Sequence, residues 1–358
     1  MMISRLSRFH YNLVRFGAKT PLESLLLFTL IPLSILYGII LWCRNLFYDL
    51  GLSQSYVSKL PVISIGNITA GGTGKTPAVD FLVKEFIRQG KKTAVVSRGY
   101  GGTFSGRVGV VSDSSGITMD AVSSGDEPFL LANRNPECSV VIAKKRVDAV
   151  RKLENENQVD VIILDDGFQH RALRRDVDIV LLDAVQPFGN GWPLPAGNLR
   201  EFKRGIKRSD LLLRTKCSGD VTPIFEDRPI FNCHHRLSDN VSDLNGNSLP
   251  ISALQGKQIL AFSGIANPES FFDDLEGIGL RLHETISFAD HVDYSDSSVM
   301  QKLLSKSADI DAMVTTEKDA VKLVSDMFEL PCYYVPIDMV ISNVDEFIET
   351  LSKHIWRK

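Results

Sequence analysis

Residues 61–80 read PVISIGNITAGGTGKTPAVD and combine a Gly-rich turn with a lysine and a threonine. The turn follows a short apolar run, Val62 to Ile65, and precedes a stretch that can open a helix. In such a loop the glycines let backbone N–H groups face an anion, the lysine reaches the β- and γ-phosphates, and the threonine hydroxyl ligates Mg²⁺. A plain strand–helix turn is the alternative, because the first glycine of the usual pattern is replaced by a threonine. We predict a nucleotide-binding loop that consists of Thr69, Ala70, Gly71, Gly72, Thr73, Gly74, Lys75 and Thr76.

Asp165 and Asp166 end the most apolar of the predicted strands, VIILDD. A carboxylate at the end of a strand is where a P-loop enzyme holds Mg²⁺. Two adjacent carboxylates repel each other unless a cation compensates them, which favours a metal site over a solvated turn. The next residues, GFQHR, add an amide, a histidine and an arginine within a short stretch.

Three further charged groups leave their roles open in the sequence. Asp126 and Glu127 lie in SGDEP, where they could simply cap a helix. The basic run 144–146 follows a predicted strand and could hold phosphates or be a solvated cluster. Asp290 and His291 stand side by side in FADHVDY. A lone histidine is usually structural, but one beside an acid can also relay a proton.

Apolar strands alternate with helical segments between residues 60 and 216, which predicts a P-loop NTPase-like, mostly parallel sheet covered on both faces. The Pro- and Gly-rich segment NGWPLPAGNLRE (190–201) is too rigid for a passive linker, and we expect a lid or substrate loop near the phosphates. The last hundred residues predict a second, smaller α/β domain. The predicted boundaries are 1–45 for an N-terminal anchor, 46–216 for the P-loop core, 217–256 for a connector with a hairpin, and 257–358 for the second domain.

The sequence around residues 5–43 is typical of a membrane-associated segment. Basic residues come first, at Arg5, Arg8, Arg15 and Lys19, and no residue between Ser24 and Cys43 is charged. This run is long enough to span a bilayer, but the leading cations favour a cytoplasmic N-terminus, which would place the nucleotide loop on the far side. We therefore favour a helix that lies in the membrane surface, with a true span and a buried core helix as alternatives. Pro32 and Gly38 are expected to interrupt it.

Composition excludes several classes of protein. The 358 residues carry a net charge of −3, so no overall field attracts nucleic acid. The five cysteines are scattered without a C-x-x-C pair, which argues against a zinc site or a disulfide framework and fits a reducing compartment.

Several motifs occur together in one order: GNITAGGTGKTP, SRGYGG, GDEP, DDGFQHR, LPAGNLRE, FSGIANPESFF, a DH pair and TTEKDAVKL. From about residue 10 to the C-terminus the chain closely resembles the tetraacyldisaccharide 4′-kinases, which phosphorylate the 4′-hydroxyl of tetraacyldisaccharide 1-phosphate in lipid A biosynthesis. DDGFQHR and TTEKDAVKL are specific in combination. Thr69 is ordinary in this family.

The resemblance implies ATP and Mg²⁺ as cofactors, a lipid substrate, and a peripheral or monotopic protein at the cytoplasmic face of the inner membrane. By motif, Asp126 and His291 are the catalytic pair, together with Lys75 of the loop, although Val292 stands where the family often has a second histidine. Asp126 would accept the hydroxyl proton, with His291 orienting it or relaying the proton. The metal would be held by Thr76, Glu127, Asp165 and Asp166. The substrate would be contacted by Asn67, Arg98, Arg146, Gln169, His170 and Arg200.

Two other functions remain open from the sequence. A membrane-linked P-loop ATPase would hydrolyse ATP without a lipid acceptor, and an anchored nucleotide sensor would bind ATP without transferring phosphate. We expect a monomer, domain closure on ATP, and no nucleic-acid partner.

Overall fold

The computed structural model describes residues 9–10, 12–217, 227–306 and 309–355. The expected cations Arg5 and Arg8 lie outside these residues. The chain divides into two compact units, each assembled from separate stretches. Unit 1 comprises residues 1–98, 143–234 and 339–358, and unit 2 comprises residues 99–142 and 235–338.

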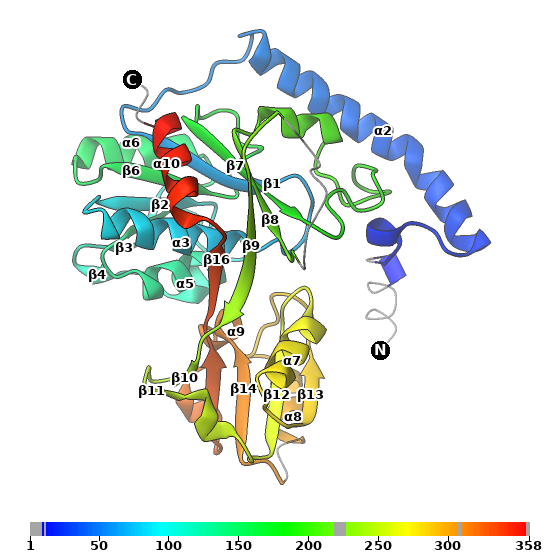
Figure 1. Cartoon of the computed structure of the whole chain (residues 1–358), viewed down its shortest axis with the longest axis vertical. Coiled ribbons are helices and arrows are strands. Elements are labelled where there is room, and N and C mark those ends of the chain that lie inside the picture. The colour runs from blue at the N-terminus through cyan, green and yellow to red at the C-terminus, as the bar shows by residue number, and fades with distance from the viewer. Residues whose placement is uncertain (1–8, 11, 218–226, 307–308, 356–358) are drawn as a thin grey trace. The chain divides into compact units, whose positions relative to one another are not determined.

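Unit 1 is built on a parallel sheet in which the strands follow the order β16-β9-β8-β7-β1-β6-β2. Parallel pairing is seen for β6–β2, β1–β6, β1–β7, β7–β8 and β8–β9. The residues of β1, β2, β6, β7 and β8 are buried throughout, as both faces of the sheet are covered (Figure 1). The bounds are β1 Val62–Asn67, β2 Thr93–Ser97, β6 Val161–Asp165, β7 Val177–Asp183, β8 Leu211–Thr215, β9 Ile230–Leu237 and β16 Ile337–Ile341.

Three helices of unit 1, α3, α6 and α10, pack through apolar faces onto this sheet. The C-terminal helix belongs to unit 1 because the Phe347 ring lies against Phe231 and Phe81, with centroids 5.2 and 6.2 Å apart. The helices are α2 Pro21–Asp49, α3 Lys75–Arg88, α6 Arg146–Glu156, η1 Lys203–Arg208 and α10 Val344–Ile355.

The long helix α2 begins at a capping box in which Thr20 and Glu23 satisfy each other's backbone N–H groups. It then continues without a break to Asp49, so the expected interruption at Pro32 and Gly38 is wrong. Proline removes one helical hydrogen bond, and the long helical runs on either side hold the helix together across that loss. Within the described residues α2 is the helix long and apolar enough to cross a membrane, a criterion that core helices and signal sequences also meet. Only 11% of its most apolar window is buried, which disfavours a core helix.

Unit 2 holds a mixed sheet with the strand order β11-β10-β15-β14-β12-β13, parallel except for the β10–β11 and β10–β15 pairs. The strands β5, β3 and β4 of this unit pair with one another in an antiparallel arrangement, with β3 between the other two. The strands are β3 Gly109–Asp113, β4 Gly116–Ile117, β5 Ser139–Ile142, β10 Asn240–Asp243, β11 Ser248–Pro250, β12 Ile259–Ser263, β13 Leu282–Ser287, β14 Ala312–Thr316 and β15 Cys332–Val335. The helices are α4 Ala121–Ser124, α5 Asp126–Arg134, η2 Ile251–Leu254, α7 Pro268–Gly277, α8 Ser297–Leu304, α9 Glu317–Ala320 and η3 Ser325–Met327.

The predicted α/β fold class with an apolar N-terminal helix is confirmed, but the predicted domain boundaries differ from the observed units. Residues 99–142, expected in the P-loop core, belong to unit 2, because Arg134 of α5 makes a bidentate ion pair with Glu317 of α9. Of the predicted connector 217–256, the described part from residue 227 onward is divided: β9 joins the unit 1 sheet, while the hairpin β10–β11 joins unit 2. The apolar run 332–341 is divided into two strands, β15 and β16, which meet at Pro336.

Candidate active site

The predicted nucleotide loop in unit 1 connects β1 to α3. Gly74 adopts a φ of 83° at the start of α3, a conformation that favours glycine. Below the loop, the buried Asn67 donates from its amide nitrogen to the Thr73 hydroxyl at 2.9 Å and to the Gly71 carbonyl at 3.4 Å. The structure therefore places Asn67, predicted to contact substrate, as a brace inside the loop.

The Pro- and Gly-rich segment expected near the phosphates lies against the same loop. The Ala70 N–H donates to the Asn198 carbonyl at 2.6 Å, and the Arg200 N–H donates to the Ile68 carbonyl at 2.8 Å. Thr69 forms a β-bridge with Leu199 between these two bonds. The backbone of residues 198–200 is thus fixed to the nucleotide loop.

Asp166 is held by the cations of this loop region. Its carboxylate accepts two hydrogen bonds from the Arg200 guanidinium at 2.7 and 2.8 Å, and the Lys75 ammonium lies 3.7 Å away. Burial opposes ionisation, but Lys75 and Arg200 outweigh it and lower the pKa of Asp166. A φ of 52° at Asp166 turns the chain sharply after β6. This carboxylate is therefore ionised beside the predicted phosphate-binding lysine.

Asp165 and Arg146 lie deeper in the same region. Asp165 is 2% exposed and accepts a hydrogen bond from the Ser97 hydroxyl at 3.0 Å. Arg146 is buried on α6, and its burial lowers its pKa although the charges of both aspartates favour the charged form. Its neighbours Lys144 and Lys145 are exposed, so the basic run divides into a buried member and two solvated ones.

The DDGFQHR segment supplies two more polar side chains at this edge. Gln169 donates to the Asn67 carbonyl at 2.9 Å. Burial, followed by the charges of four arginines, lowers the pKa of His170 to about 4, so its ring is neutral at pH 7. Those arginines are Arg146, Arg175, Arg44 and Arg98.

Among the described residues, no group of three or more His, Cys, Asp or Glu side chains is arranged to hold a metal. Unit 1 offers oxygen donors, as Mg²⁺ prefers, from the aspartates after β6 and from Thr76, which follows Lys75 at the start of α3. These donors fit Mg²⁺ better than a softer metal. None of the five cysteines, all described, is in a disulfide.

The predicted catalytic pair meets within unit 2. Asp126 is the first residue of α5, after Gly125 with a φ of 93°, and His291 lies in a turn after β13 with a φ of 59°. His291 Nδ1 lies 3.1 Å from Asp126 Oδ2. The structure therefore joins two side chains that are 165 positions apart in the sequence.

Two lysines surround this pair. Lys322 Nζ lies 3.5 Å from Asp126 Oδ2, and Lys318 Nζ lies 3.3 Å from His291 Nε2. Lys318 also approaches Glu127 Oε1 at 3.6 Å and Asp290 Oδ1 at 3.3 Å. Burial favours the neutral acid, but the His291 hydrogen bond and then Lys322 outweigh it, so that the pKa of Asp126 is lowered.

The lysines are held in place by buried polar contacts. Asp319 lies between the two lysines in the sequence, and its side chain is fully buried. Its carboxylate accepts hydrogen bonds from the Gly264 N–H at 2.9 Å and from the Thr316 hydroxyl at 2.7 Å. Lys322 also donates to the Val292 carbonyl at 3.2 Å. The residues of TTEKDAVKL thus position the pair, a role that we did not predict. The feature of the sequence that could have indicated this role is the pair of lysines four positions apart after a predicted strand.

A close approach of two backbones brings the SRGYGG loop to the turn before Asp126. A Cβ on Gly102 would lie 2.4 Å from the Ser123 carbonyl oxygen, so only glycine fits there. The exposed Tyr100 ring packs edge-on to His291, with centroids 5.6 Å apart.

Comparison with known proteins gives a consistent result. A family described as tetraacyldisaccharide-1-P 4′-kinase matches residues 26–356. The tetraacyldisaccharide 4′-kinase of Syntrophotalea carbinolica is 42% identical over 352 residues, which cover 98% of each chain. That of Geobacter sulfurreducens is 41% identical and covers 86% of this chain and 87% of its own. The crystal structure of LpxK from Aquifex aeolicus in complex with ATP matches with a TM-score of 0.79 and 30% identity, over 92% of this chain and all of that one.

Proposed function

The chain belongs to the tetraacyldisaccharide-1-phosphate 4′-kinase family, a family of ATP-dependent kinases of lipid A biosynthesis, and we propose that its two charged clusters divide the reaction. The resemblance found in the sequence is confirmed by these relatives. The cluster of unit 1, around Lys75, Asp166 and Arg200, holds ATP. The cluster of unit 2, around Asp126 and His291, accepts the proton of the acceptor hydroxyl.

Nucleotide binding rests on the loop 69–76 and on the cations beside it. Lys75 and the loop N–H groups hold the β- and γ-phosphates, and Arg200 contributes a second charge. The Lys75–Asp166 distance of 3.7 Å supports this, because Asp166 keeps the lysine at the phosphate end of the loop. The related LpxK of Aquifex aeolicus was crystallised with ATP.

Mg²⁺, when bound, neutralises charge on the β- and γ-phosphates. Thr76, Asp165 and Asp166 are the residues of unit 1 that would hold or orient it, as expected from the sequence. Glu127 of unit 2 stays a further prediction, and in the structure its carboxylate is compensated by Lys318.

Proton transfer rests on the contact between Asp126 and His291. The 4′-hydroxyl oxygen forms a bond to the γ-phosphorus, the bond to the β-phosphate oxygen breaks, and the hydroxyl proton passes to Asp126. A lysine ammonium can only donate, so Lys318 makes His291 Nε2 an acceptor. In this tautomer the ring proton is on Nδ1, and the Nδ1–H donates a hydrogen bond to the Asp126 carboxylate. This favours His291 as the residue that orients the base over a role as proton relay.

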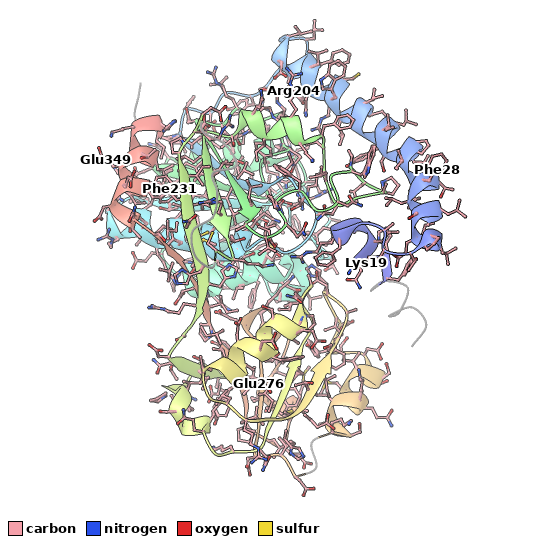
Figure 2. All side chains as sticks on the ribbon, turned by 45° about the vertical axis from the view of Figure 1, so that its right-hand side comes forward. Lys19, Phe28, Arg204, Phe231, Glu276 and Glu349 are labelled. Carbon is pink, nitrogen blue, oxygen red and sulfur yellow. The ribbon has the colours of Figure 1, made fainter. Side chains whose placement is uncertain are left out.

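The acceptor is the lipid disaccharide of the family, and its polar groups are the candidates for contact with Arg98, Arg146, Gln169, His170 and Arg200. The exposed apolar side of α2 supports membrane association, and Phe28, 73% exposed, points outward there (Figure 2). We place the protein at the cytoplasmic face of the inner membrane, because the kinase reaction needs ATP, which is in the cytoplasm. The protein acts as a monomer.

The test is the transfer of labelled γ-phosphate from ATP by detergent-dispersed protein, with and without tetraacyldisaccharide 1-phosphate. We expect label in the lipid, and loss of that label in Asp126→Ala. Release of inorganic phosphate at equal rates with and without lipid would instead indicate a membrane-linked ATPase, and normal transfer by Asp126→Ala would remove it as the base.

A further inference from the structure

The helix α2 has a protein-facing stripe that is unlike its outer surface. Its buried residues are Ser34, Gly38 and Asn45, which recur at helical spacing and are small or polar. Large apolar side chains such as Leu36 and Trp42 are about half exposed, at 55% and 52%. A helix that served only as an apolar anchor would not need a polar stripe turned toward the protein.

The side chains of the stripe contact residues 196–202. The Ala196 N–H donates to the Ser34 hydroxyl at 2.7 Å, and the Tyr37 hydroxyl donates to the Arg200 carbonyl at 3.3 Å. A Cβ on Gly38 would lie 2.3 Å from the Phe202 ring, so glycine is needed for this close approach. The same segment carries Arg200, the arginine that pairs with Asp166.

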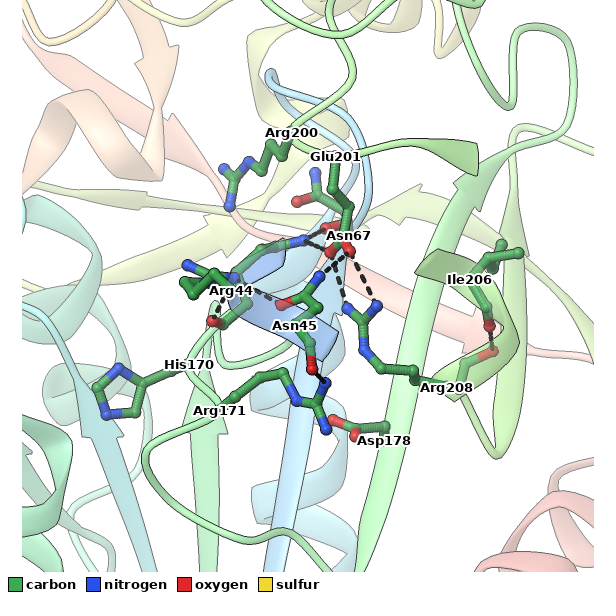
Figure 3. A network of polar contacts seen from close by, with 12 residues as sticks. Arg44, Asn45, Asn67, His170, Arg171, Asp178, Arg200, Glu201, Ile206 and Arg208 are labelled. Atoms are coloured by element: carbon green, nitrogen blue, oxygen red, sulfur yellow. Dashed lines mark hydrogen bonds and ion pairs between the residues drawn. The ribbon is translucent and has the colours of Figure 1, made fainter. Parts of the chain in front are cut away.

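Glu201 is the centre of a hydrogen-bond network that includes Asn45 and Arg208 (Figure 3). Its carboxylate is 2% exposed and accepts from Asn45 at 2.9 Å, from Arg208 at 2.9 and 2.8 Å, and from Gln169 at 3.2 Å. A buried carboxylate is stable only when donors surround it, so loss of one donor disturbs the others. Glu201 therefore connects α2, η1 and the DDGFQHR segment.

The connection continues to the nucleotide loop. Gln169, held by Glu201, donates to the carbonyl of Asn67, whose side chain braces the loop at Thr73. On the other side of Glu201, the Arg200 N–H donates to the Ile68 carbonyl. Two short paths, which combine hydrogen bonds with covalent bonds of Asn67 or of residues 200–201, thus lead from Asn45 to the loop.

We propose that Asn45 and Glu201 are positioning residues of the nucleotide site, and that α2 sets the position of Arg200 and of the loop besides associating with the membrane. This inference rests on the proposed role of unit 1 in ATP binding. Seating of α2 and binding of ATP are then coupled, so that either one favours the other.

The test measures ATP affinity without lipid, which excludes any effect on lipid delivery. Asn45→Leu keeps α2 apolar and removes the donor to Glu201, and we expect the Kd for ATP to rise about tenfold, with kcat falling up to about a hundredfold. Trp42→Leu, on the outward side of the same helix, is the matched control and should bind ATP normally. Vesicle association of Asn45→Leu should equal that of the wild type.

A double-mutant cycle separates this role from general destabilisation. If Asn45 acts through Glu201, then Asn45→Leu combined with Glu201→Gln should bind ATP no more weakly than Glu201→Gln alone. Ser34→Ala gives a milder variant should Asn45→Leu not fold, with a smaller loss in the same direction. Unchanged ATP affinity in the folded variants, or fully additive losses, would overturn the inference. A different result would contradict the proposed function: wild-type protein that transfers no phosphate to the lipid.

Discussion

The charged clusters of the two units differ in their balance of charge. In unit 1, Asp166 is contacted by two cations, Lys75 and Arg200, and the charge of Arg146 adds to them. In unit 2, two cations, Lys318 and Lys322, face four carboxylates around His291. A cluster with surplus positive charge is suited to a polyphosphate, whereas one in which carboxylates outnumber cations is suited to accepting a proton. The difference predicts that changes in unit 1 affect ATP binding and changes in unit 2 affect turnover.

The largest effect should come from Asp126→Asn. This change removes the proposed proton acceptor but keeps the size of the side chain, and we expect kcat to fall about 10²–10⁴-fold. The KM for ATP should stay close to that of the wild type. Steady-state kinetics with saturating lipid measure both, with Asp243→Asn, in a turn of unit 2, as the control.

Lys75→Ala should mainly weaken the binding of ATP, whereas Asp126→Asn should mainly lower kcat. Loss of a charge-assisted contact with phosphate costs about 1.5–3 kcal/mol, which corresponds to an ATP affinity about 10- to 150-fold weaker. Calorimetric titration with ATP measures this directly. Lys84→Ala removes an exposed lysine of the same helix and should leave the affinity unchanged. Unaltered binding by Lys75→Ala would exclude it from the phosphate site.

Lys322→Met should change the pH dependence of turnover. Removal of the ammonium 3.5 Å from Asp126 raises the pKa of this carboxyl, which the wild-type surroundings hold low. Since the base must be ionised, the acid limb of kcat/KM should move to higher pH. Lys306→Met, at an exposed ion pair of unit 2, serves as the control. An acid limb at the same pH in both variants would show that Lys322 does not act on Asp126.

The smallest effect concerns the stability of unit 1. The pKa of His170 is about 4 in the folded protein, against 6.5 for an ordinary histidine. Between these values the unfolded chain binds more protons, so the free energy of unfolding decreases as the pH falls from 6.5 toward 4. His170→Gln removes this contribution, and urea unfolding at pH 7 and pH 5 should give a smaller difference than in the wild type. If the free energy of unfolding changes between pH 7 and pH 5 by the same amount in both proteins, then His170 is already protonated at pH 5 in the folded state.

The sequence predicts local features of the fold well. The apolar strands predicted between residues 60 and 216 are observed, because each has its own apolar pattern and turn signals. The division into units was not predictable, since the ion pair that brings residues 99–142 to unit 2 joins Arg134 to Glu317, far away in the chain.

The site was predictable where a motif has its own chemistry. The nucleotide loop follows from its residues alone, and the pair of Asp126 and His291 follows only from the family motif. Lys318, Lys322 and Glu201 were not predicted as site residues. Their roles depend on how α9 packs with α5 and on a helix more than 150 positions away from Glu201 in the sequence.

The division of the reaction between the units is tested most directly by single-turnover phosphoryl transfer in Asp126→Asn at saturating ATP, measured beside its equilibrium ATP affinity. We predict wild-type ATP affinity and a transfer rate reduced about 10²–10⁴-fold. A weakened ATP affinity with an unchanged transfer rate from the bound complex would contradict the account and place Asp126 among the nucleotide-binding groups.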